Sequence, residues 1–199
     1  MGAWAFLHKT VVPFARTALT AGAIASTGDL LIQFYESDKQ SLAPDLERTA
    51  RVASFRCLHA PIIEICWRFF DAKIGLAGTF VGVAGRIASD QLLLAPPSIA
   101  CFYVSQGLME GTGLEASVAR AQESFWPSYS VCLPFWSAVH VITFSVVPVP
   151  LRMAWASVCS VGWNAFISHA NHAAGERQRR RRGAALEDAI HAPGVVKNI

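Results

Sequence analysis

A long stretch of this chain carries almost no charge, and it limits the folds that the sequence can adopt. Between Glu123 and Glu176 the only formally charged residue is Arg152. It separates two apolar segments, Ser124–Leu151 and Met153–Gly175. A helix of about 20 apolar residues crosses the hydrocarbon core of a bilayer, and each segment reaches that length. The pattern therefore predicts an integral membrane protein.

The composition agrees with this prediction. The 199-residue chain is 53% hydrophobic and 16% charged, with a mean hydropathy of +0.36, whereas an ordinary soluble domain is about 25% charged. The shortage of charge comes from long uncharged blocks rather than from an even thinning along the chain. A soluble all-α protein with a very apolar core is the less favoured alternative, because several blocks are long enough to span a membrane.

The apolar segments also indicate the fold class, which we expect to be all-α with no β-sheet. Five segments cover about residues 11–35, 49–70, 86–109, 126–147 and 149–173. We predict a polytopic transmembrane helix bundle with about four spans, in which one segment is bent or re-entrant. Four spans place the basic C-terminal region on the same side as Lys9 and the Lys73/Arg86 loop, as the positive-inside tendency favours, and five spans, which would separate the termini, remain the alternative. Residues 1–175 would form this bundle, and residues 176–199 a basic, flexible C-terminal tail.

Prolines and polar stretches interrupt the apolar segments. Pro61 should bend the second one. The pair Pro96-Pro97 should break the hydrogen-bond ladder of the third, so that a neighbouring helix or water must satisfy the freed carbonyls. The stretches Glu36–Arg51 and Glu110–Glu123 are expected to be polar connections.

Positive charge is concentrated near the C-terminal end. The net charge is +3, and the predicted tail carries a basic run, Arg177, Arg179, Arg180, Arg181 and Arg182. Beside an apolar segment, such a run is typical of a contact with anionic lipid headgroups or of a topology signal, and we expect no nucleic-acid binding. The N-terminal stretch has basic residues and no acidic residue before Asp29, which is compatible with delivery to mitochondria.

Polar residues inside apolar segments are the candidate functional residues, because such side chains are costly in lipid and mark solute pathways or contacts with partners. The candidates for a pore lining or for intramembrane contacts are Asp29, Gln33, Asp90, Gln91, His140, Arg152 and Asn164. A position at the headgroup level explains Asp29 and Gln33 equally well. A hydrogen bond between helices is the simpler role for His140.

Arg152 needs an acidic partner if it is buried. The acidic candidates within apolar segments are Asp29 and Asp90. We therefore expect Arg152 to pair with one of them and hold the bundle together, or to line a vestibule that attracts anions. An interfacial arginine that extends to the headgroups is an equally good interpretation.

The sequence contains no pattern typical of catalysis or of a metal site. It has no Walker loop, no His-Glu-x-x-His, no Gly-x-Ser-x-Gly and no paired carboxylates. His169 and His172 lie three apart, but two ligands do not make a zinc site. We expect no enzyme activity, no catalytic residue, no metal and no other cofactor.

Three groups of residues, taken in order, resemble a known family. The first is Leu19-Thr20-Ala21-Gly22 with Gly28-Asp29 and Gln33, and the second is Asp90-Gln91 with Ala95-Pro96. The third and most specific group is Trp136, Phe144, Val147-Pro148, Arg152, Trp163-Asn164 and Ser168. Over about residues 4–170 the chain resembles the Mpv-seventeen / peroxisomal membrane protein twenty-two family, small integral proteins of the mitochondrial inner membrane and of peroxisomes.

The resemblance implies a small all-α bundle and no catalytic residues. Its structural motif residues would be Gly22, Gly28, Pro96, Trp136, Phe144, Pro148, Trp163 and Ser168. It also implies a multi-pass protein that acts as a small pore or as a modulator of metabolite permeability and membrane homeostasis. The mitochondrial inner membrane is the expected location, and the peroxisomal membrane is the alternative.

Some positions depart from the family pattern. Ser137, His140 and Thr143 stand where proline, glutamine and asparagine are usual. These departures favour a second function, a non-catalytic structural accessory subunit of a large mitochondrial membrane complex such as a respiratory or ATP synthase assembly. The expected partners are the lipid bilayer together with other copies of the chain or other subunits of such a complex.

Overall fold

The computed structural model describes residues 12–36, 43–74, 79–147 and 152–191. Within these ranges every regular element is helical, which confirms the all-α prediction. The elements are α2 (Val12–Glu36), α3 (Leu46–Ile74), α4 (Phe80–Ser89), the π-helical turn η2 (Asp90–Leu94), α5 (Ala95–Met109), α6 (Leu114–Ser145) and α7 (Arg152–His191).

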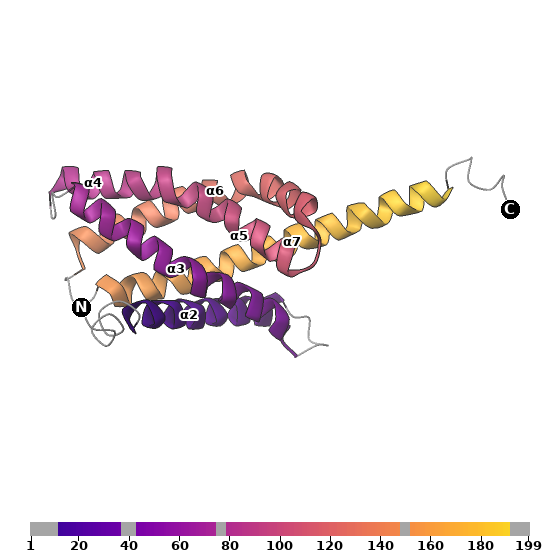
Figure 1. Cartoon of the computed structure of the whole chain (residues 1–199), viewed down its shortest axis with the longest axis horizontal. Helices are drawn as coiled ribbons and strands as arrows, with labels where there is room; N and C mark the ends of the chain where they lie inside the picture. Colours follow the sequence, from indigo (N-terminus) through magenta and orange to yellow (C-terminus); the bar gives the residue numbers. More distant parts are fainter. Residues whose placement is uncertain (1–11, 37–42, 75–78, 148–151, 192–199) are drawn as a thin grey trace, which may run out of the picture.

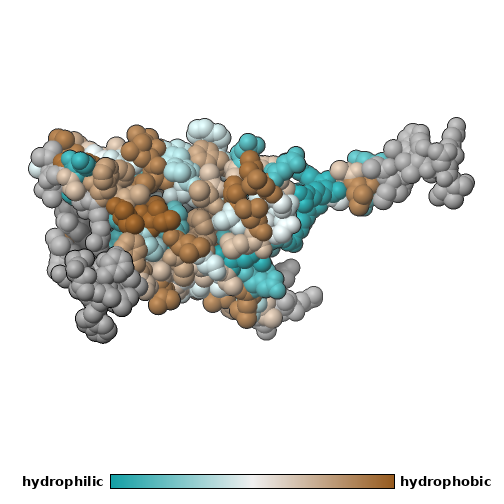
Figure 2. Space-filling model, viewed as in Figure 1, coloured by the Kyte–Doolittle hydropathy of each residue, from teal (hydrophilic) through white to brown (hydrophobic). Residues whose placement is uncertain are grey.

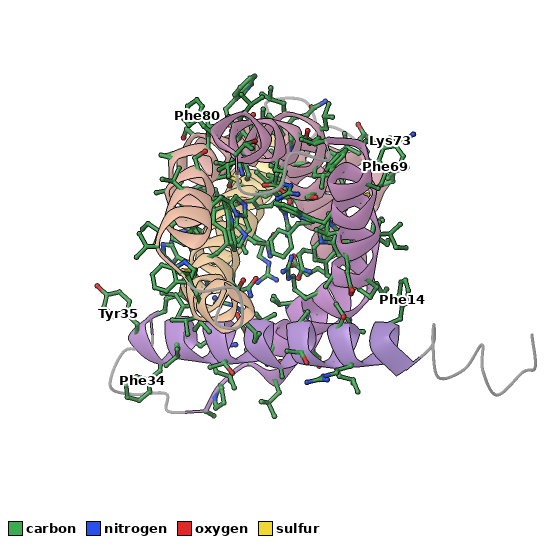
Figure 3. The ribbon with its side chains drawn as sticks, turned by 90° about the vertical axis from the view of Figure 1, so that its left-hand side faces the viewer. Phe14, Phe34, Tyr35, Phe69, Lys73 and Phe80 are labelled. Carbon is green, nitrogen blue, oxygen red and sulfur yellow. The ribbon has the colours of Figure 1, made fainter. Side chains whose placement is uncertain are left out.

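The helices form a bundle along the long axis of the molecule, and α7 extends past the others at one end (Figure 1). α2 packs against α3 and α7, α5 packs against α6, and α6 packs against α7. Seen from the end opposite the α7 extension, α2 runs across one side of the bundle while other helices are viewed more nearly end-on (Figure 3).

Two glycines let α2 approach its neighbours closely. A Cβ atom at Gly28 would lie 2.7 Å from the carbonyl oxygen of Val161 on α7, and one at Gly22 would collide with the Sγ atom of Cys57 on α3. Small residues at such contacts allow helix backbones to approach where lipid supplies no hydrophobic driving force. Both glycines belong to the motif predicted to be structural, and these contacts provide a physical reason for it.

The segment Phe80–Met109, which contains α4, η2 and α5, is the one helix among the described residues that is long and apolar enough to cross a membrane by length and composition. The hydrogen-bond ladder is interrupted at Pro96-Pro97, as the sequence predicted, but the helix continues through the two prolines. The two prolines follow Ala95 at the start of α5, inside the continuous helix Phe80–Met109, so each missing N–H group removes a bond from the ladder. Just before them the helix widens by one π-helical turn instead of ending.

The π-helical turn keeps the carbonyl groups near the prolines hydrogen-bonded. The N–H group of Ala95 donates to the carbonyl oxygen of Asp90, five residues earlier. The next bond of that type would run from residue 96 to Gln91, but proline has no N–H group. The hydroxyl of Tyr129 on α6 donates to the Gln91 carbonyl at 2.8 Å instead. A neighbouring helix therefore satisfies a freed carbonyl, as the sequence predicted.

The outer surface of the bundle is rich in large apolar side chains. Phe80 is 87% exposed, Phe34 77% and Trp126 69%. Figure 2 shows apolar residues spread over the bundle and hydrophilic residues where the α7 extension begins, and Figure 3 shows Phe34, Tyr35, Phe69 and Phe80 pointing away from the bundle. Exposed apolar surface of this extent indicates contact with a membrane or with another protein.

The second helix begins earlier than predicted. We expected it to start near Thr49, after a polar connection over Glu36–Arg51, but α3 starts at Leu46. The side chain of Asp45 accepts a hydrogen bond from the backbone N–H group of Arg48 at 2.9 Å. Asp45 therefore caps the first turn of α3.

The predicted polar connection Glu110–Glu123 is mostly helical. The turn between α5 and α6 contains Gly111 and Gly113, with φ angles of 73° and 83°, and α6 starts at Leu114. Such φ angles are readily adopted only by glycine, so the two glycines fix the turn.

The basic run was predicted to lie in a flexible tail from residue 176, but α7 continues as one helix from Arg152 to His191. This part of the sequence is rich in Ala, Arg, Gln and Glu, which favour helix. Gln178 also fastens it to α6, because its side-chain amide donates to the carbonyl oxygen of Ala116 at 2.8 Å.

Candidate functional site

Two groups of polar side chains lie inside the bundle. The first, here called the Asp29 cluster, consists of Asp29, Gln33, Glu36, Arg48, Thr49 and Ser168. The second lines a cavity between α3, the η2–α5 region, α6 and α7, here called the interior cavity.

The carboxylate of Asp29 is the centre of the Asp29 cluster and is fully buried. It accepts hydrogen bonds from Arg48 Nε at 2.9 Å, Thr49 Oγ1 at 2.6 Å and Gln33 Nε2 at 2.7 Å, and from the hydroxyl of Ser168. These donors come from α2, α3 and α7. A buried carboxylate is tolerated only with such partners, so the cluster ties three helices together.

Arg48 extends the cluster toward the end of α2. Its Nη1 atom lies 2.7 Å from Glu36 Oε2, and His169 on α7 contacts the other carboxylate oxygen of Glu36. Burial by itself would raise the pKa of Glu36, but the hydrogen bonds from Arg48 and His169 outweigh it and hold the pKa below its ordinary value.

The structure thus places Asp29 and Gln33 in a buried cluster whose members bond to one another. The sequence identified Asp29, Gln33 and Ser168 as important but missed the role of Arg48. The position of Arg48 at the start of an apolar segment was the feature of the sequence that could have indicated this role. Its distance from Asp29 along the chain gave no indication that the two would pair, because that contact depends on how α2 folds back against α3.

The side chains of Phe144 and Arg152, and all of Pro148, lie outside the described residues. The predicted pairing of Arg152 therefore stays a prediction. Of its two proposed partners, Asp29 is bonded to Arg48, and Asp90 lies beside another candidate, His140.

The interior cavity has a volume of about 170 Å³ and is partly open to the outside of the bundle. Its walls are largely aromatic, with Phe55 and Trp67 from α3, Phe102 from α5, Trp136 from α6 and Trp163 from α7. The two tryptophans that the sequence assigned to the family motif, Trp136 and Trp163, contact each other with ring centroids 6.1 Å apart.

One polar side of the cavity is built from candidates that the sequence identified. His140 Nε2 lies 3.6 Å from Asp90 Oδ2, and Gln91 Nε2 donates to the same oxygen at 2.7 Å. The ring of His140 lies against Trp67 and Trp136, with centroids 5.3 and 5.8 Å away. His140 therefore both lines the cavity and lies beside an acidic residue of another helix.

The other polar side contains residues that the sequence did not identify as a site. Arg56 Nη1 lies 3.4 Å from His59 Nδ1, and His59 Nε2 lies 2.9 Å from the hydroxyl of Ser98. Arg56 interrupts an otherwise apolar stretch of α3, which was the signal that could have revealed it.

Asn164 faces the cavity from α7 and is only 1% exposed. Neither its amide nitrogen nor its amide oxygen has a hydrogen-bond partner in the part of the chain that the structure describes. Ser168, one helical turn later, belongs to the Asp29 cluster, so the two groups of polar residues adjoin each other along α7.

The basic run lies where α7 leaves the bundle. Arg181 Nη1 lies 3.0 Å from Glu123 of α6, and Arg177 Nε lies 3.7 Å from the same carboxylate. Arg179 pairs with Glu176 within α7, whereas Arg180 and Arg182 are exposed. Exposed pairs of this kind add little to stability, so the run remains available for charged partners.

Among the described residues no group of three His, Cys, Asp or Glu side chains could hold a metal ion. The polar residues of the cavity instead offer a positive charge, hydrogen-bond donors and acceptors, and aromatic walls to a small molecule.

Comparison with known proteins agrees with the resemblance seen in the sequence. A model of the Mpv17 / PMP22 family matches residues 107–168. Protein SYM1 of Kluyveromyces lactis is 30% identical over 80% of this chain and 83% of its own length. Protein sym1 of Aspergillus oryzae is 29% identical over 80% of this chain and 91% of its own length. Protein SYM1 of Saccharomyces cerevisiae is 26% identical over 93% of both chains. No solved structure matches this chain.

Proposed function

Because this chain belongs to the Mpv17 / PMP22 family of membrane proteins, we propose that it is a non-catalytic small pore or modulator of metabolite permeability in an organellar membrane. We place it in the mitochondrial inner membrane, with the peroxisomal membrane as the alternative. The observation that carries this proposal is a cavity of about 170 Å³ with polar groups inside a bundle whose outer surface is apolar.

Exposed apolar side chains support a multi-pass arrangement. Helices other than Phe80–Met109 carry them too, including Leu19 on α2, Leu58 on α3, Val141 on α6 and Val158 on α7. A helix with apolar residues outward and polar residues inward is stable in lipid when the polar face meets other helices or a wet cavity.

In this proposal the Asp29 cluster closes one end of the interior cavity. Asn164 lines the cavity, and Ser168, one turn later on α7, bonds to Asp29. A solute that crosses the bundle along α7 must pass these bonds, so a shift of α7 relative to α2 and α3 would open or close the path.

Reconstitution into liposomes tests the proposal. Wild-type protein should release a small trapped solute faster than protein-free liposomes do. Asn164→Leu, which keeps the side-chain size but removes both polar atoms from the cavity, should slow this release several-fold. Ser130→Ala on the exposed face of α6 is the matched control and should leave it unchanged. Release equal to that of empty liposomes, or equal in Asn164→Leu and wild type, would refute the proposal.

The α7 extension favours a second function, that of a structural accessory subunit of a large mitochondrial membrane complex. Residues 179–188 are exposed in a helix that projects beyond the bundle (Figure 1). An exposed helix with a basic run offers a docking surface to another subunit. Near the bundle the same run suits anionic lipid headgroups.

Native electrophoresis of gently solubilised mitochondria separates the two functions. Migration with a large assembly that is lost on truncation after Gly175 would favour the accessory subunit. Migration as a monomer or small oligomer, unchanged by the truncation, would favour the autonomous pore.

A further inference from the structure

Arg56 brings a positive charge to the interior cavity, and no carboxylate of the described residues pairs with it. Its polar contact is with the His59 ring at 3.4 Å, its buried Nε atom has no partner, and no described carboxylate forms an ion pair with it. A guanidinium in such a place is costly unless an anion or water accompanies it.

The neighbouring histidine adds no negative charge. A guanidinium can only donate hydrogen bonds, so Nδ1 of His59 must accept and the proton must lie on Nε2, which donates to the Ser98 hydroxyl at 2.9 Å. His59 is therefore neutral in this arrangement. The hydroxyl of Ser98 keeps its own proton as a further donor.

Asn164 adds a second group that lacks a protein partner. Its amide donor and acceptor are both unbonded in a residue that is 1% exposed and lines the same cavity. Buried amides are nearly always hydrogen-bonded, so an unbonded amide on a residue that lines a cavity points to a polar occupant.

The size and walls of the cavity restrict this occupant. A volume of about 170 Å³ holds on the order of five waters or one small organic molecule. Trp67, Trp136 and Trp163 provide apolar walls, and Asp90 places a negative charge at another part of the lining. A second negative charge on the occupant would be repelled there.

We propose that the interior cavity binds a small organic monocarboxylate, with its carboxylate on Arg56 and Asn164 and its hydrocarbon part against the tryptophans. This inference rests on the proposed function and names the class of solute that the pore would favour. Dicarboxylates are disfavoured because Arg56 is the one cation without an ion-pair partner among the described lining residues, and Asp90 lies in the same lining.

Binding is measured first, with the full chain in nanodiscs. The unfolding temperature is followed by tryptophan fluorescence while propionate is added at constant ionic strength. Propionate should raise it in a saturable manner, and propionamide, which has the same shape without the charge, should need at least about a tenfold higher concentration. Succinate should also bind at least about tenfold more weakly. Equal effects of propionate, propionamide and succinate would overturn the inference.

Variants locate the effect. Arg56→Gln should lose the response to propionate, Arg56→Lys should keep part of it because the charge remains, and Asn164→Leu should weaken it. Arg16→Gln, at an exposed position on α2, is the control and should respond as the wild type does. A full response in Arg56→Gln would overturn the inference. If that variant does not fold, the comparison of the three ligands on the wild type still decides it.

Liposome flux distinguishes this inference from the proposed function. Saturable propionate binding without solute release would leave the binding site standing and refute the pore. Solute release with no preference for propionate over propionamide or succinate, and no binding, would support the pore and refute the monocarboxylate site.

Discussion

Replacing Arg48 with methionine should strongly destabilise this protein. Arg48 donates to Asp29 at 2.9 Å and to Glu36 at 2.7 Å, and its side chain is 9% exposed while that of Asp29 is fully buried. Methionine fills similar space but leaves Asp29 with only neutral donors. Loss of one partner from a buried ion pair costs about 3–5 kcal/mol, and we expect Arg48→Met to fall in this range.

Reversible unfolding in mixed micelles, followed by the fluorescence of the six tryptophans, measures this cost. The matched control is Arg51→Met, one turn later on α3. Arg51 Nη1 lies 3.8 Å from Glu47 Oε2, and the side chain of Glu47 is 92% exposed. Such a pair contributes less than about 1 kcal/mol. Asp29→Asn alone should also destabilise, because it removes the charge that balances Arg48 and replaces one of the two acceptor oxygens with an NH2 donor that faces other donors.

A double-mutant cycle tests whether the two side chains act as a pair. When Asp29→Asn is already present, Arg48→Met no longer leaves a buried negative charge, so the two changes should cost less together than the sum of each alone, with a coupling of about 2 kcal/mol. A cost of Arg48→Met no larger than that of Arg51→Met, or additive effects of the two changes, would refute the central role given to the Asp29 cluster.

Three further predictions concern the packing and the acid sensitivity of the bundle. Gly28→Ala should lower the unfolding free energy by about 1–3 kcal/mol, because the new Cβ atom would lie 2.7 Å from a backbone oxygen of α7. Gly162→Ala is the control and should not destabilise, because a Cβ atom there would have no neighbour within 4 Å. The pKa of Glu36 in the folded protein lies below 4.5, so the stability that the Glu36 carboxylate contributes is present above pH 4.5 and is lost as the pH falls through that folded-state pKa. Glu36→Gln should therefore reduce the acid destabilisation seen in a pH series of melting curves. Tyr129→Phe removes the 2.8 Å hydrogen bond to the Gln91 carbonyl and should cost about 1–3 kcal/mol; an unchanged melting temperature would mean that water takes its place.

The sequence could predict the helical class and most of the candidate residues, because both depend on local composition. Asp90, His140 and Asn164 were identified as polar residues in apolar segments, and all three line the cavity. Arg56 interrupts the second apolar segment, and the sequence left open whether its side chain faces protein, water or the interface. Its position in the cavity depends on which face α3 turns toward α5.

Two features of the fold, the extent of α7 and the helix around Pro96, depend on contacts with α6 that composition does not reveal. The basic run at Arg177 was expected in a flexible tail, and the structure places it in α7, which continues to His191 and bonds to α6 through Gln178. The interrupted ladder at Pro96-Pro97 was predicted, but only the structure shows the π-helical turn before the prolines and identifies Tyr129 as the donor to the freed Gln91 carbonyl.

The sequence by itself determined that this protein is helical, that it belongs in a membrane and which family it resembles, since each follows from hydrophobic patterning and ordered short motifs. Only the tertiary structure decided that Asp29 meets Arg48 rather than lipid or water, and that Arg56 and Asn164 line one cavity. The physical reason is that a polar side chain in an apolar helix requires a hydrogen-bond or ionic partner. The sequence shows this requirement, but it does not show which residue is the partner. Packing of the helices, set by close contacts such as that at Gly28, determines which partner lies within reach.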